Sequence, residues 1–406
     1  GKLAVGGANA PVLVSGSSET DVRTPTSSVS QLIDASIGRR QPLEFRTQNA
    51  FITLTAGAMP DNGTGRGAAV DGARTGSGNF MVNGYDNNDQ ALGGGSVLGG
   101  GGAVVSISPD ALQEYRVLSH DNPAEYGRAG GFSTDTVMRS GTNSWHGSLF
   151  EYNRIQALAA QHFMNGFGGN NLKDALVRNQ FGGSIGGPIK KDKTFFFATL
   201  ELHRLRQGSP LTTTATTGAF VDFVNSGAFA TFNESDPNGI CMQYNGAACP
   251  GAFASSRTLG PVFQQLYAAE KRNFPYATSN FSNAGAGWYS SDVVTYPVPV
   301  YGDVSVTQGQ STNQYRGSFQ IDQHFSDNDN LSATYLIDRS DSVIQYAGGG
   351  TSIGPDYVNP EDAQLFGLTW THVFNPTLTN QLRASFLRHT SNFSAPGTAG
   401  VPMIVT

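Results

Sequence analysis

Apolar and polar residues alternate along the chain from residue 144 onwards. In 313–325 the odd positions carry Tyr315, Gly317, Phe319, Ile321 and Phe325, and the even positions carry Arg316, Ser318, Gln320, Asp322 and His324. Because successive side chains of a strand point to opposite faces, this stretch predicts a strand with one apolar and one strongly polar face. Similar patterns predict six more strands, at 144–153, 177–187, 194–205, 331–338, 366–371 and 382–386.

The connections between these predicted strands alternate in length. Tight turns are expected at 188–192, 326–330 and 375–379, and longer stretches join the other neighbours, the longest running from 206 to 312. A soluble β-sandwich has no such asymmetry, and its strands are usually about five or six residues long. Outer-membrane barrels have short periplasmic turns, long outer loops and strands of about 9 to 11 residues. The pattern therefore favours an antiparallel transmembrane β-barrel over a soluble β fold.

The residues before 144 differ in composition and pattern from the predicted strands that follow. Gly, Asn and Asp dominate 59–102, and short strands are expected at 79–82, 114–119 and 133–139. Amphipathic patterns predict short helices at 27–37, 44–54 and 108–115, and another at 259–271 in the long loop. For the third helix, Ser108 can cap the first turn, and Pro109 needs no hydrogen-bond donor there. The chain is thus predicted to be mainly β, with a small α+β domain followed by part of a barrel.

The amino-acid composition and net charge exclude some classes of function for this chain. The 406 residues include 51 Gly, 25 Phe and 14 Tyr, and only 14% are charged, against about 25% in ordinary soluble domains. The net charge of −6 gives no basis for nucleic-acid binding. No apolar stretch approaches the ~18 residues of a spanning helix. The first residues lack the features of a signal peptide, so the chain is expected to begin at a processed or internal position.

The two cysteines, Cys241 and Cys249, both lie in the long loop. A metal site would need further Cys or His nearby, and the nearest histidines are His203 and His324. A local disulfide is therefore the preferred interpretation, and it indicates an oxidising compartment outside the cytoplasm.

Motifs for catalysis are weak. The sequence GGSIG at 182–186 matches G-x-S-x-G, but a Gly-Pro turn follows in place of the helix that a nucleophile elbow requires. The glycine-rich run at 93–102 lacks the Lys-Ser/Thr ending of a phosphate-binding loop. The acidic run at 86–89 lacks the spacing of an EF-hand. We predict no catalytic residue, no cofactor and no metal ligand, and therefore no enzyme.

Several motifs occur in order over the middle of the chain. They are FMVNGYDNND at 80–89, VSISPDALQEYRV at 105–117, AEYGR at 124–128, RSGTNSWHGSLFEY at 139–152, NQFGGSIGGPI at 179–189 and KTFFF at 193–197. Together they closely resemble the plug-to-barrel junction of TonB-dependent outer-membrane receptors. The chain is most similar to the large receptors, common in Acidobacteria, that carry an N-terminal carboxypeptidase-regulatory-like domain.

The resemblance implies a domain organisation. Residues 1–9 would be the tail of a regulatory-like domain, 10–26 a TonB-box-like segment and linker, 27–142 the plug, and 143–406 part of a barrel with about seven strands and the long outer loop 206–312. Family barrels have 22 strands, of which this chain would supply about a third. The TonB box is expected at Val12, Leu13, Val14, Ser15 and Gly16.

The resemblance also implies a function. Family members import scarce nutrients, such as metal chelates, cofactors, glycans or peptides, across the bacterial outer membrane, with energy delivered by TonB. The expected partners are the TonB energiser complex, outer-membrane lipid and a nutrient ligand, without nucleic acid. An export or surface-interaction role and a soluble β-rich binding module are the alternatives. Candidate ligand-binding residues at the plug apex are Asn83, Tyr85, Asp86 and Asn88.

Overall fold

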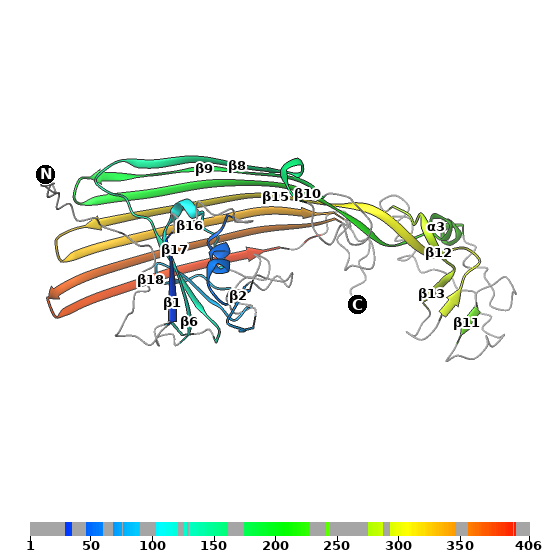
Figure 1. Ribbon diagram of the computed structural model, residues 1–406, viewed down its shortest axis with the longest axis horizontal. Coiled ribbons are helices and arrows are strands. Elements are labelled where there is room, and N and C mark those ends of the chain that lie inside the picture. The colour runs from blue at the N-terminus through cyan, green and yellow to red at the C-terminus, as the bar shows by residue number, and fades with distance from the viewer. Residues whose placement is uncertain are drawn as a thin grey trace, which may run out of the picture.

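In the computed structural model of the protein, strands are the dominant element (Figure 1). It describes residues 29–34, 46–59, 68–74, 76–89, 103–120, 126–127, 130–160, 174–226, 241–243, 275–286, 293–345, 356–392 and 394. None of the helices in these ranges has the length and apolar character needed to cross a membrane.

Seven long strands form one antiparallel sheet in which neighbours in sequence are neighbours in space (Figure 1). Their order is β8-β9-β10-β15-β16-β17-β18, with the short β12 (Ser279–Ser282) paired beside β15. The seven strands are His146–Ile155 (β8), Ala175–Lys190 (β9), Thr194–Thr216 (β10), Tyr301–His324 (β15), Asp329–Ile344 (β16), Tyr357–Asn375 (β17) and Leu378–Ser391 (β18). We call this the large sheet. All seven predicted membrane strands are present, and within the described residues β8 and β18 form its two edges, so the barrel is not closed.

The three predicted tight turns all lie at one end of the large sheet (Figure 1). At the β9–β10 turn, Asp192 adopts a left-handed backbone with φ of 63°, and the Lys193 N–H donates to the Lys190 carbonyl over 3.1 Å. Asp and Asn tolerate that conformation better than bulkier residues do. The alternation of short and long connections is therefore confirmed.

The long connection is shorter than expected, because its flanking strands continue into it. β10 and β15 remain paired from Thr194↔Gln323 to Thr216↔Tyr301, so the connection runs over 217–300 instead of 206–312. At its start, α3 (Gly218–Asn225) is capped by Thr217, whose hydroxyl accepts from the Phe220 N–H over 3.0 Å. The strand signal was missed because Thr and Ser, common in 209–216 and 301–312, do not give apolar alternation.

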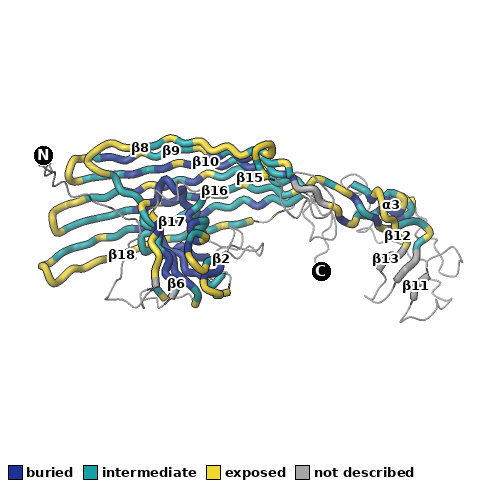
Figure 2. The backbone as a smooth tube through the Cα atoms, viewed as in Figure 1, coloured by how far each residue is buried: buried dark blue, intermediate teal, exposed yellow. Residues whose placement is uncertain are grey.

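The two faces of the large sheet have the predicted characters. On β15 the Phe319 side chain is 41% exposed on the outer face, whereas its neighbour Gln320 is only 7% exposed on the inner face. Outer positions of the other strands show the same pattern, with exposed apolar side chains at Leu149, Ile185, Leu200, Tyr335, Phe366, Trp370, Leu382 and Phe386. In Figure 2 the buried residues concentrate where the inner face meets the small domain.

The small domain lies against the inner face of the large sheet (Figure 1). Its five-stranded sheet has the order β1-β6-β7-β4-β5. These strands are Val29–Asp34, Leu112–His120, Ser133–Met138, Asn79–Val82 and Tyr85–Asp86, and β2 (Ala58–Met59) pairs with β3 (Ala69–Val70) beside them. Its core includes the edge-to-face pairs Phe51–Tyr115 and Phe80–Phe132.

One of the predicted helices is wrong, and two are shorter than expected. Residues 29–34 form strand β1, and the helix predicted at 44–54 is the 3₁₀ helix Gln48–Leu54 (η1). The predicted helix at 108–115 is one 3₁₀ turn, Pro109–Ala111 (η2), followed by β6. Because β6 is hydrogen-bonded on both sides, to β1 and β7, tertiary pairing outweighs its local helical pattern. The helix predicted at 259–271 lies outside the described residues.

Candidate functional site

The candidate site is the interface between the small domain and the inner face of the large sheet. The β4–β5 hairpin reaches this face through its tip, where Asn83 and Gly84 have φ values of 49° and 75°. The Asn83 Nδ2 atom donates to Gln320 Oε1 and Thr334 Oγ1, each over 3.1 Å. The Asn83 Oδ1 atom accepts from the Met138 N–H over 2.9 Å, so this one amide joins the hairpin, β7 and the large sheet.

Tyr85 makes the second contact of the hairpin. Its hydroxyl lies 2.6 Å from Thr369 Oγ1, and its ring passes directly over Gly367. A Cβ atom at Gly367 would lie only 2.3 Å from that ring, so a side chain there is incompatible with the observed position of Tyr85. The strand glycine thus provides the space in which the hairpin docks.

The other two apex candidates have internal partners. Asp86 Oδ1 accepts from the Asn88 backbone N–H over 2.9 Å. Asn88 is fully buried, its Oδ1 accepts from the Phe80 N–H over 2.9 Å, and its Nδ2 donates to Asn79 Oδ1 over 2.8 Å. The structure therefore brings Asn83 and Tyr85 to the large sheet and uses Asp86 and Asn88 to hold the loop. Ligand contact by any of the four stays a prediction.

A cluster of buried charges lies at the centre of the interface. The Arg316 Nη1 atom of β15 donates to Glu201 Oε1 of β10 over 3.1 Å and to the Arg46 carbonyl of the small domain over 3.0 Å. The other carboxylate oxygen of Glu201 accepts from the Ser108 hydroxyl over 2.6 Å. Glu201 and Arg316 expose 0% and 8% of their side chains. Arg316 and Glu201 therefore each contact a side chain of the large sheet and a residue of the small domain.

Asp338 extends this cluster on the next strand. Its Oδ2 atom accepts from the Ser106 N–H of the small domain over 3.1 Å, and its Oδ1 accepts from Gln314 Nε2 over 2.7 Å. The Arg316 Nε atom lies 4.0 Å from the same carboxylate. Burial of these groups is tolerated because each carboxylate meets a cation or several donors.

Arg46 anchors the small domain in a different way. Its Nη2 atom pairs with Asp110 over 2.9 Å, inside the small domain. The guanidinium carbon also lies 3.9 Å from the centre of the Tyr152 ring and 5.3 Å from that of Phe150, both on β8. A guanidinium at that distance from an aromatic ring is attracted by the negative face of the ring.

An apolar patch on the inner face was not predicted. Leu336 of β16, Leu365 of β17 and Leu387 of β18 are paired across three adjacent strands and pack against the core of the small domain. Leu336 and Leu365 are fully buried. The available signal was the interruption of the inner polar series, with Leu336 between Thr334 and Asp338.

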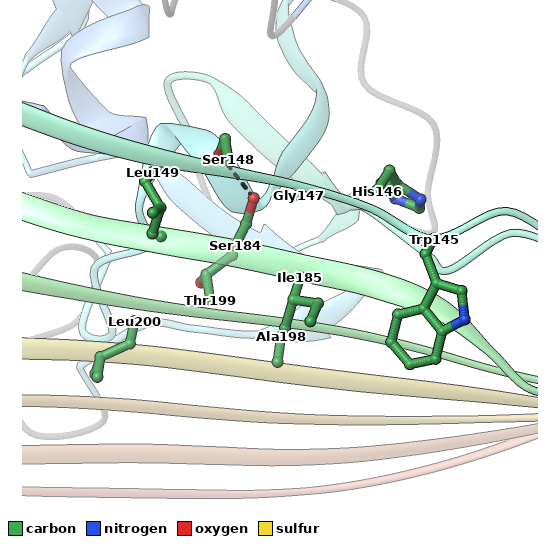
Figure 3. A pocket seen from close by; sticks show the side chains of 11 residues that line it. Trp145, His146, Gly147, Ser148, Leu149, Ser184, Ile185, Ala198, Thr199 and Leu200 are labelled. Carbon is green, nitrogen blue, oxygen red and sulfur yellow. Dashed lines mark hydrogen bonds between the residues drawn. The ribbon is translucent and has the colours of Figure 1, made fainter.

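The remaining sequence candidates do not form a site in the described residues. The predicted TonB box at 12–16 and Cys249 lie outside what the structure describes, so the disulfide of Cys249 with Cys241, the first residue of strand β11 (Cys241–Gln243), stays a prediction. The GGSIG motif lies inside β9, where Ser184 Oγ is 2.8 Å from Ser148 Oγ of the neighbouring strand (Figure 3). No group of three or more His, Cys, Asp or Glu side chains suitable for a metal occurs among the described residues.

Comparisons with known proteins find several similar sequences and structures. The TonB-dependent transporter Oar of Myxococcus xanthus is 30% identical over 162 residues, which are 38% of this chain and 14% of that protein. The Pseudomonas aeruginosa ferric enterobactin receptor mutant Q482A, solved with enterobactin, aligns with a TM-score of 0.49 and 11% identity over 89% of this chain and 41% of its own. The Escherichia coli outer-membrane transporter YddB aligns with a TM-score of 0.40 and 11% identity over 89% and 48%.

The chain therefore spans less than half the length of these proteins. The model of a family described as "Outer membrane beta barrel domain" matches residues 137–403. That range contains the seven strands of the large sheet, with their exposed apolar outer face. The chain belongs to the outer membrane beta barrel domain family, and its place is the bacterial outer membrane.

Proposed function

We propose that the complete protein is a TonB-dependent receptor that imports a scarce nutrient, and that the small domain is its plug. The observation that carries the proposal is a folded domain docked on the inner face of a membrane sheet through buried polar contacts. The contacts of Arg316, Glu201 and Asn83 with their partners on the other side are examples. Such a domain obstructs the lumen, so transport requires that it be moved or rearranged. The sequence similarity to Oar, named as a TonB-dependent transporter, supports the same proposal.

The nature of the interface is compatible with such movement. A neutral protein hydrogen bond contributes only about 0.5–1.5 kcal/mol net, because water replaces the lost partner when the groups separate. Polar contacts such as Asn83–Gln320 and Tyr85–Thr369 can therefore be exchanged for water as the plug moves. The matching proteins are transporters and receptors, and we propose no catalytic role.

The finer features of the proposal follow the sequence motifs. We infer that 10–26 contains the TonB box, at Val12 to Gly16, and that an N-terminal carboxypeptidase-regulatory-like domain precedes it, as in the large acidobacterial receptors. A short β-prone segment can pair with the exposed edge of a partner sheet and transmit a pull through main-chain hydrogen bonds. The ligand class is a metal chelate, cofactor, glycan or peptide.

The test uses cysteine capture in cells that produce the complete protein. Val14→Cys should form a disulfide with a cysteine placed in the peptide-binding strand of TonB, whereas Ser18→Cys in the linker should not. In parallel, Val14→Pro removes an N–H that strand pairing requires and should abolish energised accumulation while leaving surface adsorption intact. Iron-labelled siderophores, cobalamin, maltodextrins and short peptides are the probes. Absence of capture at every position from Val12 to Gly16 would refute the assignment of the box. Accumulation that persists without TonB would refute the dependence of import on TonB.

A further inference from the structure

A groove of about 760 Å³ lies on the outer face of the large sheet, across β8, β9 and β10. That volume is within the about 300–1,000 Å³ of sites that hold small molecules. Figure 3 shows Trp145, Leu149, Ile185 and Leu200 on one side of these strands and Ser148 on the other. The four side chains are exposed, and residues with little or no side chain lie among them: Gly147, Gly183 and Ala198.

The strand pairing explains why the groove exists. Ile185 is opposite Gly147 on one side and Ala198 on the other, and Gly183 is opposite Leu149 and Leu200. Large and small residues therefore alternate across the three strands, which leaves a depression bounded by the large ones. Further pairing at the edge of β8 would add a strand in the plane of the sheet, so the outer face would stay open. In an outer-membrane protein that face meets lipid.

A cluster of positive charge lies beyond the groove, at the β9–β10 turn. Lys190, Lys191 and Lys193 are all exposed at the β9–β10 turn, and none of them belongs to an ion pair found among the described residues. The Asp192 carboxylate in the same turn accepts from Asn143 Nδ2 over 2.6 Å. The turn therefore presents three ammonium groups at the level where the short turns of a barrel meet lipid headgroups.

The spacing between groove and lysines fits a lipid molecule. From Ile185 to Lys190 is five residues, or about 17 Å at ~3.3 Å per residue. With a strand tilt of about 40°, this corresponds to a depth of about 13 Å, which is within the ~15 Å half-thickness of the hydrocarbon core. Trp145, whose ring contacts Phe196 edge-to-face at 5.5 Å, lies between the two levels, where membrane proteins favour Trp.

We propose that this surface binds one phospholipid of the periplasmic leaflet, with an acyl chain in the groove and an anionic headgroup at Lys190, Lys191 and Lys193. Apolar contact alone would give no preference among lipids, because any acyl chain fits a hydrocarbon surface. The lysines make the site selective for anionic lipids, because each basic residue near an anionic headgroup makes the free energy of lipid binding more favourable. The site is separate from the inner-face interface and does not depend on the identity of the transported nutrient.

The test measures retained lipid on the complete protein. The protein is reconstituted in nanodiscs with equal amounts of phosphatidylglycerol and phosphatidylethanolamine, returned to mild detergent, and analysed by native mass spectrometry. Wild type should retain one phosphatidylglycerol. Ala198→Leu should lower retention about tenfold, equivalent to about 1.4 kcal/mol, or roughly two displaced methylene groups. Lys191→Gln with Lys193→Gln should remove the preference for phosphatidylglycerol.

The matched control is Ala333→Leu, which adds the same volume on the outer face of β16 outside the groove. It should retain lipid as wild type does. Equal retention by Ala198→Leu and Ala333→Leu would overturn the proposal, and so would equal retention of the two phospholipids by wild type. Barrel folding of each variant is checked by heat-dependent mobility in gels. If Ala198→Leu does not fold, the lysine pair decides, because an unchanged headgroup preference there also overturns the proposal.

Discussion

Arg316 offers the sharpest test of how the small domain is held. Arg316→Met removes the cation but keeps most of the aliphatic stem, so the loss is mainly electrostatic. It leaves Glu201, with a fully buried side chain, and Asp338, with 8% exposure, without their shared cation. It also removes the hydrogen bond to the Arg46 carbonyl, which joins the large sheet to the small domain.

The expected magnitude follows from that burial. Removing one partner of a buried ion pair costs about 3–5 kcal/mol, because the remaining charge has neither its partner nor water. At 1.4 kcal/mol per factor of ten, even 3 kcal/mol shifts the docking equilibrium more than a hundredfold. We expect water to enter the interface, since hydration of the two carboxylates is then favourable.

Hydrogen exchange of the complete protein in detergent is the appropriate assay. Peptides covering 103–112 should exchange faster in Arg316→Met, because the Ser106 N–H bonded to Asp338 lies among them. The control is Arg339→Met, which breaks an ion pair of 2.9 Å with Asp362 whose side chains are 57% and 32% exposed. Exposed pairs contribute about 1 kcal/mol or less, so exchange should stay near wild type. Equal exchange in both variants would refute the view that the buried charges hold the small domain.

Three further substitutions test which face of the large sheet meets lipid, the contact of the β4–β5 hairpin with that sheet, and the titration of a buried carboxyl group. Phe319→Arg should impair membrane assembly more than Gln320→Arg, because a charge facing lipid near the midplane costs about 2–4 kcal/mol, and equal folded fractions after reconstitution would contradict the face assignment. Gly367→Val should displace the Tyr85 ring, 2.3 Å from the added Cβ, and increase protease cleavage of the small domain without preventing barrel folding. Burial raises the pKa of Asp135, so the folded state binds its proton more tightly than the unfolded state does, and stability falls as pH rises through the raised pKa. Asp135→Asn should flatten that dependence in urea unfolding measured from acidic to neutral pH.

Sequence patterns predicted the large sheet well because membrane strands obey one simple constraint. The outer face meets lipid, so alternation such as Tyr315, Phe319 and Ile321 against Arg316, Ser318 and Gln320 is maintained along each strand. Tight turns such as the one predicted at 326–330 then place β15 and β16 in register, from His324↔Asn330 onward. Seven strands, their faces and the pairing of strands joined by tight turns follow from these two signals.

The interface was harder to predict because its partners are far apart in the sequence. Asn83 and Gln320 are separated by 237 positions, and nothing local in either stretch indicates that they meet. The alternation of apolar and polar positions places Arg316 and Glu201 on the inner face. It does not give the relative positions of two strands that are joined by a long loop. For a related reason, the helix predicted at 27–37 is a strand and that predicted at 108–115 is helical only at 109–111, since the pairing of β1 with β6 joins stretches about eighty residues apart.

The inner face of the large sheet is not polar at every position. A lumen filled with water would select polar side chains throughout, but here much of the inner face meets a folded domain. Leu336, Leu365 and Leu387 match the apolar core of that domain, at about 25 cal/mol for each Å² removed from water. The apolar patch contributes affinity without direction, whereas Arg316 and Asn83 fix the position of the domain through contacts of defined geometry. Interruptions of the polar series on an inner face therefore indicate where a barrel wall contacts protein instead of water.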